Sequence, residues 1–200
     1  MNKLALVLVL AIITLTVAGW VITRDDQPES QNITYPSPPP VTFIPPTPLP
    51  LPTATPDPRL GQPLPEVTFD TLDGEPIRLR DLEGQIVFLN FWATWCDPCR
   101  AEMSLLQRLQ DEHGEEGVRV IALTDPLSGQ TEDDIREFVD SFDLTLTVAL
   151  SSDLAFYDAV QVWQIPTTII MDRRGIVRFI HVGELHPEDI GWYLDRLNAG

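Results

Sequence analysis

The sequence predicts an α/β fold in which a mixed central β-sheet has helices on both faces and a β-hairpin precedes the core. Apolar, strand-like runs alternate with helix-like stretches from Ile86 to Val160, which is typical of strands joined by helical crossovers. Two further runs flank Arg173-Arg174-Gly175 and predict a hairpin near the end of the chain. Asp73-Gly74, between two short alternating runs, indicates the earlier hairpin.

Composition divides the 200 residues into three segments: an N-terminal segment 1–24, a proline-rich linker 25–60 and a folded domain 61–200. Leu4–Ile22 is a run of nineteen residues without a charge. As a helix it would be ~28 Å long, close to the ~30 Å hydrocarbon core of a bilayer. Lys3 precedes this run, which favours an N-terminus inside the cell and the rest of the chain outside.

A cleaved signal peptide is the alternative interpretation of segment 1–24, but its apolar region is usually shorter than this one. We therefore expect a single-pass anchor in the cell membrane and a C-terminal domain on the extracytoplasmic side. The linker contains twelve of the nineteen prolines, so it is expected to be extended and disordered rather than to form a core. It is either a passive spacer or a docking segment for a proline-binding partner.

The folded domain is expected to begin near Gly61 with the hairpin strands Val67–Asp70 and Ile77–Leu79. A buried strand, Ile86–Phe91, follows and leads into a helix over Asp97–His113. Gly114 is a candidate C-cap for that helix.

The second half of the domain repeats the same alternation. Thr131, followed by three acidic residues, predicts a capped helix start, and Ile135, Phe138, Val139 and Phe142 give that helix one apolar face. Pro166 is expected at the first residue of a strand. The other expected elements are strands Val118–Leu123, Thr145–Leu150, Pro166–Asp172 and Ile176–Ile180, and helices over Ser152–Val160 and from Pro187.

The chain is strongly acidic. Thirty Asp and Glu residues against thirteen Lys and Arg residues give a formal charge of −17. Nucleic acid is therefore excluded as a partner, because its phosphates would be repelled.

The two cysteines of the chain, Cys96 and Cys99, form a Cys-x-x-Cys pair at a strand-to-helix junction. There the helix N-terminus favours a thiolate, which is what thiol–disulfide exchange requires. Structural zinc needs four ligands, and covalent haem needs histidine after the second cysteine, where this chain has Arg100. A static disulfide would close too short a loop to stabilise a fold much. We expect a redox pair, with no metal and no cofactor.

Residues 88–102, Phe-Leu-Asn-Phe-Trp-Ala-Thr-Trp-Cys-Asp-Pro-Cys-Arg-Ala-Glu, resemble the extracytoplasmic thioredoxin-like proteins of the TlpA/ResA type. The resemblance extends from about Gly61 to Asn198. It implies a thioredoxin-like fold and the activity of a thiol–disulfide oxidoreductase.

Placement at the helix start predicts Cys96 as the nucleophile and Cys99 as the more buried, resolving thiol. The resemblance implies that Ile165-Pro166 is a cis peptide facing the cysteines and that its backbone binds an extended substrate. Trp95 and Pro98 complete the expected substrate-binding set.

Where thioredoxin has a titrating aspartate, this chain has Asn90. Glu102 matches a glutamate that TlpA-like proteins place three residues after the second cysteine, and the resemblance implies a catalytic role. The alternative for Glu102 is a solvated carboxylate in the first turn of the helix.

Protein disulfides are the expected substrates. The resemblance suggests apocytochrome c as a client and a CcdA- or DsbD-like membrane protein as electron donor. A peroxiredoxin-like peroxidase would show Pro-x-x-x-Thr-x-x-Cys, but residue 90 is Asn and Thr94 lies two before Cys96. A copper-delivery or scaffold domain would have three residues between its cysteines and a downstream histidine ligand. Here the spacing is two and His181 is isolated.

Overall fold

The computed structural model describes residues 57–199, so the expected anchor and most of the expected linker lie outside the described part. Within residues 57–199 no helix is both long enough and apolar enough to cross a membrane. The described elements are β1 (Thr68–Thr71), β2 (Ile77–Arg78), η1 (Leu79–Leu82), β3 (Ile86–Phe91), α2 (Asp97–His113), η2 (Gly114–Glu116), β4 (Val118–Thr124), α3 (Glu132–Ser141), β5 (Thr147–Leu150), α4 (Leu154–Ala159), β6 (Thr167–Met171), β7 (Val177–Val182) and α5 (Pro187–Asn198).

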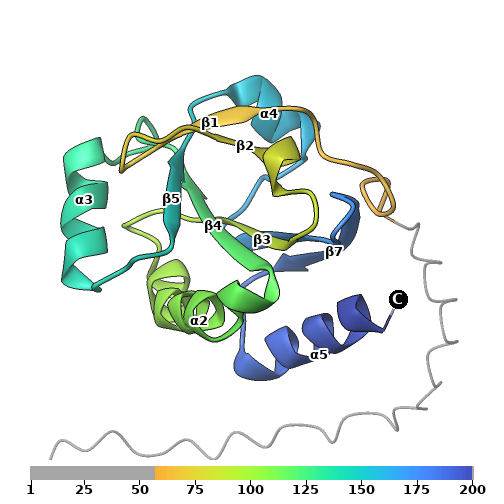
Figure 1. Ribbon diagram of the computed structural model, residues 1–200. Coiled ribbons are helices and arrows are strands. Elements are labelled where there is room, and N and C mark those ends of the chain that lie inside the picture. Colours follow the sequence, from red (N-terminus) through yellow and green to blue (C-terminus); the bar gives the residue numbers. More distant parts are fainter. Residues whose placement is uncertain (1–56, 200) are drawn as a thin grey trace, which may run out of the picture. The chain divides into compact units, whose positions relative to one another are not determined.

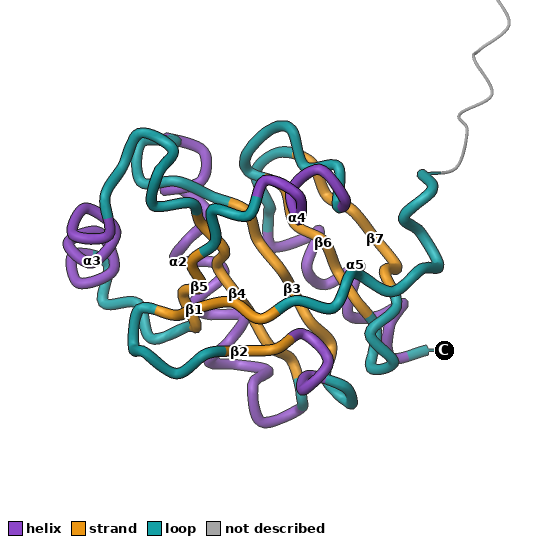
Figure 2. Tube along the Cα trace, turned by 90° about the horizontal axis from the view of Figure 1, so that it is seen from above, coloured by secondary structure: helices purple, strands orange, loops and turns teal. Residues whose placement is uncertain are grey.

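The strands form a mixed sheet with the order β2-β1-β5-β4-β3-β6-β7. Strands β3, β4 and β5 run parallel to one another, whereas β1, β6 and β7 each run antiparallel to a neighbour. Figure 2 shows β3 between β4 and β6 in the middle of the sheet. The predicted α/β architecture with a mixed sheet and flanking helices is confirmed.

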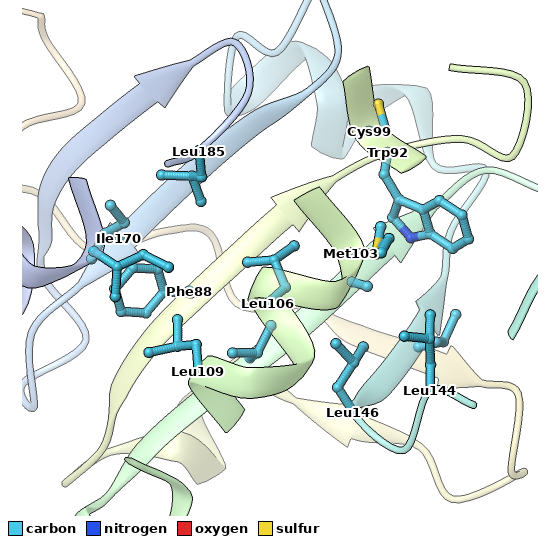
Figure 3. Packing of buried hydrophobic residues seen from close by; sticks show 14 of the residues in the cluster. Phe88, Trp92, Cys99, Met103, Leu106, Leu109, Leu144, Leu146, Ile170 and Leu185 are labelled. Carbon is cyan, nitrogen blue, oxygen red and sulfur yellow. The ribbon is translucent and has the colours of Figure 1, made fainter. Parts of the chain in front are cut away.

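Both faces of the sheet are covered, which is why all six residues of β3 are buried. Ile86 and Phe88 face a cluster built with α2, α3 and α5, whereas Val87, Leu89 and Phe91 face a second cluster built with α4 and η1. Figure 1 shows α2 and α5 on one side of the sheet and α4 on the other. In Figure 3, Cys99 and Trp92 lie at one end of the first cluster, so the redox pair is anchored in the core.

Local signals account for the helix boundaries. Thr131 caps α3: its Oγ1 accepts a hydrogen bond from the Asp134 amide (3.2 Å), and the Asp134 carboxylate accepts one from the Thr131 amide (2.7 Å). Gly114 follows α2 as predicted but has a right-handed conformation, with φ of −59°. The chain turns instead at Gly117, where φ is +84° and an added Cβ would lie 2.7 Å from the Arg173 guanidinium.

Residues that precede the core contact both edges of the sheet. Strand β1 pairs antiparallel with β2 and with β5. At the other edge, the Gly61 amide donates to the Val177 carbonyl and the Val177 amide donates to the Gln62 carbonyl, both at 2.9 Å. Arg59 also contacts the domain, because its guanidinium donates to the Val160 carbonyl at 2.7 Å. Ordered packing therefore begins slightly before Gly61.

Candidate active site

The two cysteines lie where β3 passes into α2. Cys96 is the N-cap residue of α2, and its Sγ is bonded to Cys99 Sγ at 2.06 Å. The Cys99 amide donates a hydrogen bond to Cys96 Sγ at 3.3 Å. Cys96 retains 6% of its accessible surface and Cys99 none, so an external sulfur can reach only Cys96. The helix N-terminus and this amide both stabilise negative charge on Cys96 Sγ after reduction.

Pro98 lies in the first turn of α2 and is exposed, as is Asp97. A proline is well tolerated there because the first amides of a helix have no carbonyl partner within the helix. Both side chains thus border the sulfur of Cys96 without covering it.

Pro166 lies near the carboxyl end of β3 because β6 pairs with β3. Phe91, the last residue of β3, is opposite Thr167, the first residue of β6. The preceding Ile165-Pro166 peptide bond is cis, as the resemblance of the active-site sequence implied. Pro166 is buried, whereas Ile165 is partly exposed and packs against both core clusters. The sheet register therefore brings Pro166 to the carboxyl end of β3, from which the chain continues to Cys96.

Glu102 is buried behind the cysteine pair, one helical turn after Cys99, and only 1% of its surface is exposed. Its Oε1 accepts a hydrogen bond from Asn90 Nδ2 and its Oε2 accepts one from the Leu185 amide, both at 2.7 Å. Burial raises the pKa of Glu102 to about 7, although both hydrogen bonds favour the ionised form. A solvated carboxylate, the alternative considered from the sequence, is therefore wrong, because the segment at Leu185 covers Glu102.

Asn90 connects this carboxylate to the strand that follows Pro166. Its Nδ2 also donates to Thr168 Oγ1 at 3.0 Å, while its Oδ1 is buried and has no hydrogen-bond partner among residues 57–199. Rotation of the amide would turn Oδ1 toward Glu102 and let it accept a hydrogen bond from the neutral acid. Asn90 is thus suited to either protonation state of Glu102.

An aromatic groove opens on the other side of the cysteine pair. It has a volume of about 660 Å³, and its lining includes Trp95 from the active-site loop and Trp163 from the segment before Pro166. Trp95 is 57% exposed and Trp163 is 73% exposed. Trp92 lines the groove too but is buried, with its ring centroid 4.9 Å from that of Phe138. Trp95, which was expected to contact the substrate, is therefore open to solvent, whereas Trp92 belongs to the core.

Gln130 fixes the loop between β3 and Cys96, a role that the sequence did not reveal. This buried side chain accepts from the Thr94 amide (2.8 Å) and donates to Thr124 Oγ1 (2.7 Å) and the Asp125 carbonyl (2.9 Å). Thr124 Oγ1 in turn donates to the Trp92 carbonyl at 2.8 Å. The only signal in the sequence is a polar residue just before a helix cap, which is too common to be informative.

The histidines take part in local contacts. His186 is the N-cap residue of α5, and His181 lies 2.9 Å from the Tyr193 hydroxyl. Over residues 57–199 no group of three or more His, Cys, Asp or Glu side chains is arranged to hold a metal ion.

Comparison with known proteins places this geometry among redox proteins. Residues 60–180 match the model of the AhpC/TSA family. The chain is 37% identical over 135 residues to the thioredoxin-like protein YneN of Bacillus subtilis, covering 68% of this chain and 78% of YneN. It is 34% identical over 139 residues to the thiol-disulfide oxidoreductase ResA of Bacillus cereus, covering 70% of this chain and 79% of ResA.

Solved structures agree with this fold. The exposed lipoprotein thioredoxin Etrx1 of Streptococcus pneumoniae superposes with a TM-score of 0.60 at 26% identity, over 66% of this chain and all of that one. StoA of Bacillus subtilis superposes with a TM-score of 0.58 at 24% identity, over 67% of this chain and 98% of StoA, a likeness of fold alone.

Proposed function

The chain belongs to the AhpC/TSA family of thioredoxin-like proteins and is a thiol–disulfide oxidoreductase, and from this premise we propose that it reduces disulfides in other proteins outside the cytoplasm. The observation that carries the proposal is the Cys96–Cys99 disulfide at the start of α2, with the Cys99 amide directed at Cys96 Sγ. Only Cys96 is accessible, so the pair has one attacking sulfur and one resolving sulfur.

The reaction proceeds in two exchange steps. The thiolate of reduced Cys96 attacks one sulfur of the client disulfide, forming a mixed disulfide and releasing the other client sulfur as a thiolate. Cys99 then loses its proton and attacks Cys96 Sγ. This step forms the Cys96–Cys99 disulfide and releases the second client thiolate. Two electrons pass to the client, and the resulting thiolates take up protons.

Glu102 is proposed as the group that receives the proton of Cys99. It lies one helical turn from Cys99, and burial raises its pKa to about 7, so it can take up and release a proton near neutral pH. Asn90, which occupies the position of the usual titrating aspartate, cannot do this itself but holds the carboxylate through its amide.

The direction of electron flow is proposed to be reductive. Strong oxidants of this fold owe their potential, near ~−120 mV, to a highly stabilised thiolate in the reduced form. Here the exposed carboxylate of Asp97 stands next to Cys96 and opposes that thiolate. Equilibration with a glutathione redox buffer should give a potential well below that of the oxidants, and Asp97→His should make it more oxidising. A wild-type potential near that of the oxidants would contradict the proposal.

We also propose that the chain is anchored in the cell membrane by Leu4–Ile22, that apocytochrome c is its client, and that a CcdA- or DsbD-like membrane protein supplies its electrons. The support is the uncharged N-terminal run and the resemblance to ResA. Carbonate washing of membranes with N-terminal sequencing tests the anchor, since a soluble mature form lacking this run would exclude it. Disulfide-linked complexes trapped with Cys99→Ser test the client.

A further inference from the structure

The groove beside the cysteines is a pre-formed feature with an open mouth. Phe91 and Leu123, at the ends of β3 and β4, contribute to its lining, as does Leu154 of α4, which is 76% exposed. The Trp95 indole is fixed there because its Nε1 donates to the Ser128 carbonyl at 2.9 Å. The groove therefore presents apolar side chains to solvent, and one of them, the Trp95 indole, is held in place by a hydrogen bond.

The groove is lined by the residues that directly precede Cys96 and Pro166 in the chain. Trp95 directly precedes Cys96, and Gln164 and Ile165 directly precede Pro166. A polypeptide whose sulfur reaches Cys96 must therefore place some of its neighbouring residues over the groove. Three of the large apolar side chains exposed in residues 57–199 line this groove, namely Trp95, Leu154 and Trp163. Such a concentration beside a reactive group marks an interaction site.

Charge defines the kind of residue that fits. Asp125 and Asp158 line the groove, and no lysine or arginine does. Neither carboxylate forms an ion pair within residues 57–199. Burial and the charge of Asp125 raise the pKa of the neighbouring Tyr157, so the hydroxyl there is neutral and adds no negative charge. A cation placed beside the aromatic rings would be favoured by both the carboxylates and the ring faces.

We propose that this groove binds the client segment next to its disulfide, and that it selects clients with a bulky apolar side chain and a lysine or arginine close to the reacting cysteine. The inference rests on the proposed function and adds its substrate class. A strongly acidic client segment would be repelled by the groove and by the overall charge of −17.

The test uses pre-reduced protein and short disulfide-containing peptides with three kinds of flanking residue: Phe with Lys, Phe with Glu, and Ser with Lys. Each rate of peptide reduction is divided by the rate with 2-mercaptoethanol, which removes the intrinsic reactivity of the peptide. We expect the Phe–Lys peptide to be favoured over the Phe–Glu peptide roughly tenfold or more at low salt, and less at high salt. It should also be favoured over the Ser–Lys peptide.

Variants locate the preference. Trp163→Ala should reduce the preference for phenylalanine roughly fivefold, and Asp158→Asn should reduce the preference for lysine roughly threefold. Matched controls are Trp192→Ala and Asp195→Asn, which lie on α5, the helix that packs on the opposite face of the sheet. These two should leave both preferences unchanged.

Three results would overturn the inference: equal normalised rates for the three peptides, equal losses in the α5 controls, or a dimer of the wild type that Trp163→Ala dissociates. The last would assign the groove to a second copy of the chain. Failure of the proposed function looks different, because the reduced wild type would then leave every peptide disulfide intact.

Discussion

The two sides of the cysteine pair differ in how they treat polar and apolar groups. Behind the pair, the carboxylate of Glu102 is buried among Asn90 and the Leu185 amide. In front of it, Trp95 and Trp163 are largely exposed. Each arrangement lowers the stability of the fold, because a carboxylate is more stable in water and an aromatic ring is more stable in the core. In the proposed mechanism the two sides have separate tasks: the buried side holds a carboxylate of raised pKa, and the open side provides contact area for the client.

The largest effect on disulfide reduction is expected from substituting the two cysteines one at a time, because one is accessible and the other is buried. Cys96→Ala should abolish disulfide reduction, because the accessible sulfur is lost. Cys99→Ala should retain attack and accumulate a mixed disulfide, because the resolving sulfur is lost. Non-reducing electrophoresis with a model disulfide protein, followed by mass spectrometry, measures both. Accumulation of the mixed disulfide in Cys96→Ala would reverse the two roles.

The buried side is tested next by Glu102→Gln. Because the pKa of Glu102 is raised in the folded state, its contribution to stability is fully present below pH 4.5 and is lost as the pH rises toward 7. The free energy of unfolding should therefore fall by about 3 kcal/mol across this range from Glu102 alone. In Glu102→Gln that part of the fall should disappear, because glutamine does not titrate.

Urea titrations at several pH values measure this difference, with Glu112→Gln as the control. Glu112 is an exposed residue of the same helix. An unchanged pH dependence of stability in Glu102→Gln would show that the buried side does not hold a shifted carboxylate.

Gln130→Ala probes the link between the two sides, since Gln130 is buried but holds the loop that carries Trp95. Loss of its hydrogen bonds should lower the free energy of unfolding by roughly 2–3 kcal/mol and slow exchange as well. Gln107→Ala is a matched control: Gln107 accepts from the amides of Thr145 and Leu146, away from the active-site loop. It should lower stability without slowing exchange, which denaturation and stopped-flow measurements on both variants can establish.

The smallest effect is expected on the open side from Trp95→Phe. The ring remains, but its hydrogen bond to the Ser128 carbonyl is lost, which should change stability by only about 0.5 kcal/mol. Peptide reduction should slow a few-fold, because the groove is less well ordered. A large loss of stability would mean that Trp95 is part of the core rather than of a contact surface.

Features encoded by near neighbours in the chain were predictable from the sequence. The cap of α3 at Thr131 and the placement of Cys96 at the start of α2 each depend on residues within one helical turn. Gly114 is the C-cap residue of α2, as predicted, but the left-handed glycine lies three residues later at Gly117, because η2 extends the helical path.

Features that depend on distant contacts were not predictable. The environment of Glu102 is decided by Leu185, which is 83 positions away. The loop at Thr94 is held by Gln130, 36 positions away. The groove likewise requires β3, β4 and α4 to come together. Local sequence patterns give no indication of such distant pairs, which are set by how the strands and helices pack.

Residues 61–78 cover parts of both edges of the sheet, which matters for self-association rather than for redox chemistry. An uncovered sheet edge offers free amides and carbonyls to a strand of another molecule, which is a common origin of aggregation. Here β1 occupies the outer side of β5, and Gly61 and Gln62 occupy the beginning of β7. The strand left at the first edge, β2, has only two residues. This stretch therefore limits self-association, and a domain shortened to begin at β3 should lose solubility at high concentration even with its cysteine pair intact.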